Sequence, residues 1–212
     1  MGDKDTKLSR REREREAHRQ ELLEAAERVF VREGYHGATV EKIAQEAEFA
    51  VGTLYNFFEG KDDLYARVIE RIVEDFMIQF EEKVLSKEDP EQAIASLIEL
   101  RLTHYENHQG FFRVLFETVP SSRLDPSRTL PTRISGAYER YLDSVTDIFR
   151  RGVSQGVFDE TDPLYLTLCL EGIVNAFYWS KRKSTEPLTV RVEKMKREFL
   201  GRIKRRLEKG LQ

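Results

Sequence analysis

The chain has 212 residues, and its 35 Lys and Arg against 38 Asp and Glu give a formal net charge of −3. Hydrophobic residues make up 40% of it, enough for a core, while Gly and Pro are few. These values exclude collagen-like chains, and the single cysteine, Cys169, excludes an internal disulfide. The length fits one large domain or two small ones. The slightly acidic total gives no indication of a nucleic-acid partner.

The distribution of apolar residues bears on the cellular compartment. No stretch of about 18 apolar residues occurs, so the sequence predicts no transmembrane helix and no membrane partner. The N-terminus is charged and has no apolar run behind it, unlike a secretory signal. We therefore expect a cytoplasmic protein.

Charge is unevenly distributed along the chain. Residues 1–65 carry a net −4, residues 66–180 a net −7 and residues 181–212 a net +8. Basic residues, interleaved with Glu, are frequent before residue 20: Lys4, Lys7, Arg10, Arg11, Arg13, Arg15 and Arg19. Such a run is usually a solvated tail, and it suggests contact with a nucleic acid only if a nucleic-acid-binding motif follows. The basic C-terminal run suits the last turn of a helix and is expected to be solvated.

Helical periodicity dominates the first third of the chain, with no sustained alternation of period two. It predicts helices over residues 13–33, 40–47, 51–57 and 62–85. Gly34 is expected to end the first of these helices and Gly60 to follow the third. Thr39 is a candidate N-cap for the second helix.

The remaining chain has the same helical periodicity. It predicts further helices over residues 91–107, 111–119, 132–155, 163–183 and 188–209, separated by Gly110, an irregular loop over 120–131, Gly156 and Pro187. The expected fold class is therefore all-α, with about nine helices and no strands.

The second and third helices are short and closely spaced after the first, which is typical of a helix-turn-helix. In that motif the third helix enters the major groove of DNA while the second crosses the backbone. Small residues early in the third helix, such as Gly52, would permit close approach. Thr53, Tyr55 and Lys61 would supply phosphate and base contacts.

The sequence of residues 22–65 resembles the N-terminal domain of the tetracycline-repressor (TetR) family. The residues that carry this resemblance are Ala26, Phe30, Gly34, Tyr35, Thr39, Ile43, Ala44, Ala47, Gly52, Thr53, Leu54, Tyr55, Phe58, Lys61 and Leu64. The resemblance implies a transcriptional regulator, expected to be a repressor, that binds a palindromic operator as a dimer. A small apolar or amphipathic effector is expected to release it.

The resemblance also implies residue roles. Thr39 would touch a phosphate, and Lys61 would hold another at the start of the fourth helix. The residues facing the groove and backbone would be Val51, Gly52, Thr53, Tyr55 and Asn56. Two residues depart from the family pattern: Glu48 stands where a turn glycine is usual, and Ala50 where a serine caps the third helix. The missing cap should cost roughly 0.5–2 kcal/mol of helix stability.

Three regions are therefore expected. Residues 1–14 would form a basic arm along the DNA, residues 15–65 the DNA-binding domain with its helix-turn-helix at 39–58, and residues 66–212 a ligand-binding and dimerisation domain. In the last region, polar and aromatic residues on apolar helices are candidate effector contacts: Phe76, Phe80, Arg101, His104, Tyr105, Phe112, Phe116, Tyr141, Glu171 and Asn175.

The last two helices are expected to form a homodimer. Leu164, Leu168, Ile173 and Phe177, with the stripe from Val192 to Leu207, would build an intermolecular four-helix bundle. No cofactor is expected. Two readings of other classes remain open, a helical enzyme or metal-binding protein and an architectural DNA binder. His104 and His108 share a helix face, but the sequence shows no third metal ligand at the spacing typical of a metal-binding motif.

Overall fold

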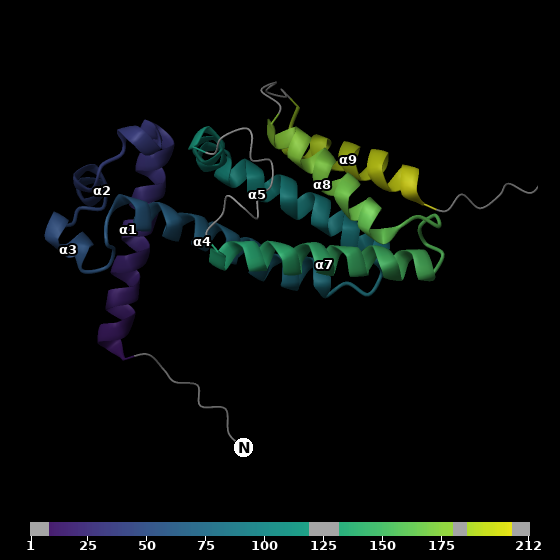
Figure 1. The fold of residues 1–212 in the computed structure, drawn as a ribbon, viewed down its shortest axis with the longest axis horizontal. Coiled ribbons are helices and arrows are strands. Elements are labelled where there is room, and N and C mark those ends of the chain that lie inside the picture. Colours follow the sequence, from purple (N-terminus) through teal and green to yellow (C-terminus); the bar gives the residue numbers. More distant parts are fainter. Residues whose placement is uncertain (1–8, 119–131, 180–185, 205–212) are drawn as a thin grey trace, which may run out of the picture. The chain divides into compact units, whose positions relative to one another are not determined.

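The computed structural model describes residues 9–118, 132–179 and 186–204. These residues form eight α-helices (Figure 1): α1 (Arg10–Gly37), α2 (Val40–Glu46), α3 (Val51–Tyr55), α4 (Lys61–Phe80), α5 (Pro90–Thr118), α7 (Thr132–Ser154), α8 (Pro163–Trp179) and α9 (Leu188–Ile203). A π-helical turn, η1 (Glu81–Leu85), continues α4. The only β pairing within these ranges is an isolated bridge between Phe158 and Lys204. The all-α class is confirmed.

The helix count differs from the expected nine because residues 90–118 form a single helix. The break expected at Gly110 is present two residues earlier, as a kink at His108, and the helix continues beyond it. A Cβ added at Gly110 would lie 2.5 Å from Cγ1 of Val31 on α1. Gly110 is therefore a close-packing position within the helix and not a helix end.

The chain divides into two compact units. Unit 1 comprises residues 1–72 and 110–122, and unit 2 comprises residues 73–109 and 123–212. The sequence placed a single boundary after residue 65. The division lies later because the apolar face of α4 stays buried to Ile72, and Phe111 and Val114 of α5 are buried too. The chain passes between the units within α4 and within α5.

The core of unit 1 is built on one face of α1. Leu22, Ala26, Val29 and Phe30 recur at three- and four-residue spacing and are fully buried. Helix α2 contributes its own apolar face against this core, led by Ile43. The chain turns out of the regular part of α1 at Gly34, whose φ of 71° is a backbone conformation that glycine adopts without steric cost. The expected stop at Gly34 is thus confirmed as a backbone break, although helical residues resume after it.

The N-terminus of α1 is a capping box. The Ser9 hydroxyl accepts from the backbone N–H of Glu12, and the Glu12 carboxylate accepts from that of Ser9. The bond from Ser9 lowers the pKa of Glu12. Arg10, Arg11 and Arg13 are therefore helical and exposed, whereas Lys7 lies outside the described residues.

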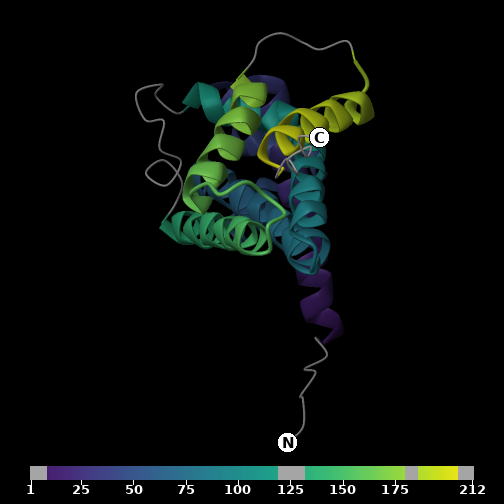
Figure 2. The same cartoon turned by 90° about the vertical axis from the view of Figure 1, so that its right-hand side faces the viewer.

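Unit 2 holds a larger core, formed by residues of η1 and of all the helices in this unit. Helices α7 and α8 contact each other, and both views show them crossing at an angle (Figures 1 and 2). Phe149 of α7 packs on Phe158 and Phe199, with ring centroids 5.7 and 6.2 Å apart. Among the described helices none is both long and apolar enough to cross a membrane.

Candidate functional site

Helices α2 and α3 form a tight helix-turn-helix. The Thr39 hydroxyl accepts from the backbone N–H of Lys42 at 3.3 Å, so the expected N-cap of α2 is confirmed. Between the helices the Phe49 N–H donates to the Ala44 carbonyl at 2.9 Å, which closes the turn. The backbone of Glu48 has a φ of 60°, which explains why a glycine would suit this position. Ala50 precedes α3 without a side-chain cap, as the sequence predicted.

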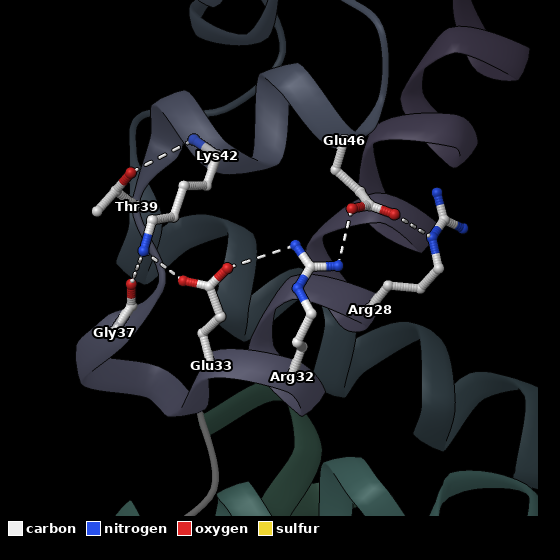
Figure 3. Close-up of polar contacts among 7 residues, drawn as sticks. All are labelled: Arg28, Arg32, Glu33, Gly37, Thr39, Lys42 and Glu46. Carbon is white, nitrogen blue, oxygen red and sulfur yellow. Dashed lines mark hydrogen bonds and ion pairs between the residues drawn. The ribbon is translucent and has the colours of Figure 1, made fainter.

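A chain of ion pairs joins α1 to α2 (Figure 3). Glu46 of α2 accepts from Arg28 at 3.0 Å and from Arg32 at 2.9 Å, both on α1. Arg32 also pairs with Glu33, and Lys42 bridges Glu33 and the Gly37 carbonyl. The pKa of Glu46 is lowered, chiefly by Arg32, and that of Glu33, chiefly by Lys42. This network fixes how α2 lies on α1 and was missed from the sequence, where only the i, i+4 spacing of the two arginines pointed to it.

The first half of α1 packs against the end of the helix-turn-helix. The Arg15 guanidinium lies 5.7 Å from the ring of Phe57, and Arg19 lies 5.8 Å from Phe58. The His18 ring meets Phe49 edge-on at 5.1 Å. These cation–π and edge contacts hold residues on both sides of α3. Arg15 and Arg19, two members of the basic run before residue 20, therefore support the position of α3.

Helix α3 buries one side and exposes the other. Leu54 is fully buried, while Tyr55 is 54% exposed and Gly52 and Asn56 are also exposed. Val51 and Thr53 are half-buried. A Cβ added at Gly52 would meet no atom of the protein within 4 Å. Packing within the chain thus gives no reason for a glycine here, whereas close approach of a partner to this face would.

Lys61, expected from the sequence to hold a phosphate, has partners within unit 1. Its ammonium donates to the Tyr35 carbonyl at 3.1 Å and lies 4.7 Å from the centre of the Tyr35 ring. The Tyr35 hydroxyl donates to the Asp62 carboxylate, and this bond raises the pKa of Tyr35 to about 12. The ammonium has three donors, so the bond to Tyr35 leaves donors for another acceptor.

In unit 2, four of the expected effector residues form one polar cluster. Arg101 Nη1 donates to both carboxylate oxygens of Glu171, at 2.7 and 2.8 Å, and to the Tyr141 hydroxyl at 2.8 Å. Arg101 Nη2 donates to Asn175 Oδ1 at 3.2 Å, and the Tyr141 hydroxyl donates to Glu171 at 2.7 Å. Burial raises the pKa of Tyr141 well above its usual value, so this phenol remains a donor.

Aromatic rings cover this polar cluster, as the sequence suggested. Phe76 and Phe80 meet the Tyr141 ring edge-on at 5.5 and 5.1 Å, and Phe76 also meets His104 at 5.3 Å. Tyr138 stacks on Tyr141 at 6.1 Å. Within unit 2 the predicted set therefore converges on one polar centre with apolar walls.

The other expected effector residues are Tyr105, Phe112 and Phe116. Tyr105 is half-buried in α5, and Phe112 belongs to unit 1. The Phe116 side chain lies outside the described residues.

Of the two helices expected to form the dimerisation surface, α8 exposes its apolar residues and α9 buries them. Apolar residues of α8 form an exposed stripe: Leu164, Tyr165, Leu168, Ile173 and Phe177. In contrast, Val192, Met195 and Phe199 of α9 lie in the core of unit 2, each at most 6% exposed. The α9 stripe is thus intramolecular, because it fills the core that α5 and α7 leave open. Leu207 lies outside the described residues.

A shallow groove of about 360 Å³ runs between α8 and α9. Its lining includes the apolar residues Ile173, Phe177 and Phe199 and the basic residues Arg191 and Lys194. The apolar stripe of α8 is continuous with this groove, which makes one exposed apolar face.

Part of the sequence is similar to known bacterial transcriptional regulators. Residues 22–68 match the family model described as bacterial regulatory proteins, tetR family. The transcriptional activator FasR of Mycolicibacterium smegmatis is 28% identical over 137 residues, 65% of this chain and 61% of FasR. The fatty acid metabolism regulator protein of Bacillus subtilis is 25% identical over 140 residues, 66% of this chain and 70% of that protein. The transcriptional repressor NicS of Pseudomonas putida is 35% identical over 98 residues, 46% of each chain.

Solved structures share the fold over most of the chain. The ketosteroid transcriptional regulator KstR2 of Mycobacterium tuberculosis superposes with a TM-score of 0.70 at 19% identity, covering 89% of this chain and 95% of its own. AibR in complex with isovaleryl coenzyme A and operator DNA superposes with a TM-score of 0.64 at 20% identity, covering 85% and 97%. The helix-turn-helix therefore lies in a chain that shares the fold of such regulators, and residues 22–68 belong to the tetR family of bacterial regulatory proteins.

Proposed function

We propose that this protein is a DNA-binding transcriptional regulator that inserts α3 into the major groove of an operator. The observation that carries the proposal is the outward face of α3, where Gly52, Tyr55 and Asn56 are exposed while Leu54 anchors the helix. A glycine that the fold does not require, next to an exposed tyrosine and amide, suits close approach to DNA. Family membership of residues 22–68 supports the same role.

The proposed DNA contacts extend from α3 to its neighbours. Val51 and Thr53 would lie at the edge of the α3 contact surface, and Thr39 would contact a phosphate at the start of α2. Lys61 would hold a second phosphate with its remaining donors while it stays bonded to the Tyr35 carbonyl. Because residues 1–65 carry a net −4, we expect weak non-specific affinity and a small salt dependence.

The proposed assembly is a two-fold homodimer through α8. A run of exposed apolar side chains along one helix, continuous with an apolar groove, is the kind of surface that a second copy covers. Two recognition helices related by a two-fold axis would read the two half-sites of a palindromic operator. Helix α9 would contribute only the residues that border the groove.

The proposed effector is a small apolar or amphipathic molecule that binds in unit 2. The Arg101–Glu171–Tyr141 centre, with aromatic walls, offers polar groups for one end of a ligand and apolar surface for the rest. The Bacillus subtilis relative is named a fatty acid metabolism regulator protein, and AibR was solved with isovaleryl coenzyme A. A fatty acid or its acyl thioester is therefore the first ligand class to test.

The proposed mechanism is ligand-dependent release. Helix α4 runs from Lys61 to Phe80 without interruption, so a shift of Phe76 and Phe80 on ligand binding would be transmitted along it towards the DNA-binding helices. We propose that the protein represses transcription when it binds the operator. The relatives include both an activator, FasR, and a repressor, NicS. A protein whose partner is operator DNA would act in the cytoplasm.

The proposal is tested by mobility shift with the DNA upstream of its own gene. Wild type should give a shifted band that unlabelled operator removes and random DNA does not. Tyr55→Ala should give no such band. Glu82→Gln, an exposed change in η1, serves as the matched control and should bind like wild type. A footprint of one two-fold symmetric site is expected. Wild-type binding by Tyr55→Ala would contradict the proposed role of α3, and release by no acyl ligand would contradict the effector class.

A further inference from the structure

Three metal-ligating side chains meet between α4 and α5 within unit 2. They are Asp75 of α4, and His104 and His108 one turn apart on α5. Their donor atoms lie within 4.8 Å of one another, and His104 Nε2 is 4.0 Å from Asp75 Oδ2. The two imidazole rings are 4.8 Å apart. The sequence showed only the two histidines, because Asp75 comes from another helix.

We propose that Asp75, His104 and His108 bind a divalent first-row transition-metal ion such as Zn²⁺, Co²⁺ or Ni²⁺. Bonds of about 2.0–2.2 Å to nitrogen and carboxylate oxygen place the ligands of one ion about 3–4 Å apart, so small side-chain rotations close this triad on an ion. Two imidazoles select such ions over Mg²⁺ and Ca²⁺, which take oxygen ligands. Three protein ligands leave one or more positions for water or a ligand atom.

The surroundings of the triad suit this role. Asp75 Oδ2 accepts from the Gln79 side-chain amide at 2.8 Å, an outer-shell bond that orients the carboxylate. His104 is buried with Phe76 against its ring, whereas Asp75 is exposed. The site thus has a dry inner wall and an open side through which an ion can enter.

The backbone of α5 is also shaped at this point. His108 is the one residue inside α5 with non-helical angles, φ −116° and ψ 17°, a sparsely populated region that is often found at functional residues. Residues four apart lie on one face of a regular helix, so the spacing of His104 and His108 brings the two rings together. The kink changes the direction of the helix at the second of the two histidines.

The location of the triad gives the ion a regulatory role, a step that rests on the proposed function. Asp75 lies three residues after the point where α4 passes from unit 1 to unit 2, and His108 lies two residues before the corresponding point in α5. An ion bound to both would tie together the two helices at the place where the chain leaves unit 2. Metal binding is therefore expected to alter operator affinity.

The site is tested first without DNA, so that its failure is distinct from failure of the regulator proposal. Metal-free full-length protein is titrated with Co²⁺, whose visible absorption reports the ligand set, and with Zn²⁺ by equilibrium dialysis. We expect one ion per chain, and Zn²⁺ should displace Co²⁺. Absence of binding by either ion at micromolar concentration would overturn the proposal.

Variants locate the ion. Asp75→Asn and His108→Gln remove one ligand each and should weaken Zn²⁺ binding at least about tenfold, the least that loss even of an outer-shell partner costs. Glu74→Gln, the exposed neighbour of Asp75, is the matched control and should bind like wild type. Circular dichroism verifies that each variant is folded. Unchanged affinity in both ligand variants would place any bound ion elsewhere and overturn the assignment.

The regulatory step is measured separately by operator titration with Zn²⁺ or with a chelator. Operator affinity should differ at least several-fold between the two conditions for wild type and for Glu74→Gln, but not for His108→Gln. A metal effect that persists in His108→Gln, or none in wild type with the ion bound, would refute the regulatory role while leaving the binding site intact.

Discussion

The buried ion pair of Arg101 and Glu171 offers a stability prediction. Glu171 is 5% exposed and accepts from Arg101 and from Tyr141. Glu171→Gln keeps the shape but leaves the guanidinium, whose side chain is 12% exposed, without its counter-charge. Breaking a buried pair by removing one partner costs about 3–5 kcal/mol, and we expect about 3 kcal/mol because the Gln oxygen still accepts one bond.

Equilibrium unfolding in urea at neutral pH, followed by circular dichroism, measures this loss. Glu99→Gln is the control, since Glu99 pairs with Lys196 at the surface and should lose at most about 1 kcal/mol. The double variant Arg101→Met with Glu171→Leu removes both charges and should recover most of the loss. A loss below about 1 kcal/mol in Glu171→Gln, or a double variant no more stable than Glu171→Gln, would refute the claim that these charges are coupled.

Three further predictions concern the DNA-binding helices and the dimer. Glu48→Gly should raise the free energy of unfolding by about 0.5–1 kcal/mol, because it relieves a left-handed backbone, and a decrease in urea unfolding would contradict this. Leu168→Glu should yield folded monomers in sedimentation velocity, whereas an intact dimer would exclude the α8 face. Glu33 and Glu46 have lowered pKa values in the folded protein. Their ion pairs therefore stabilise the fold fully above the pKa of an unfolded glutamate, about 4.3, and this stabilisation is lost as the pH falls through the lower folded pKa values. Acid unfolding should therefore be shallower in Glu46→Gln than in wild type, and equal slopes would argue against the pairs.

Local signals predicted the DNA-binding part of the fold well. The break at Gly34, the cap at Thr39 and the uncapped Ala50 each depend on a few neighbouring residues, and all three are present in the structure. The same short-range character explains the outward face of α3, because Leu54 is the apolar residue that must point inwards.

Tertiary contacts account for what the sequence did not predict. Gly110 has the local pattern of a helix break, but the kink lies two residues earlier at His108, and a glycine is required at 110 because Val31 leaves no room for a side chain. The apolar stripe of α9 has the pattern of an interface, yet Val192 and Phe199 are needed in the core of unit 2. Asp75 joins the two histidines only through the pairing of α4 with α5, which no spacing along the chain encodes.

The central claim, that α3 reads DNA, is tested most directly by a pair of glycine variants. An added Cβ at Gly52 in α3 or at Gly201 in α9 meets no protein atom within 4 Å, so both Gly→Ala changes should stabilise the fold by about 0.5–1 kcal/mol. Operator affinity, measured by fluorescence anisotropy, should fall at least tenfold in Gly52→Ala, because a methyl group then stands in the DNA contact, and remain unchanged in Gly201→Ala. Wild-type operator affinity in a folded Gly52→Ala protein would contradict the account.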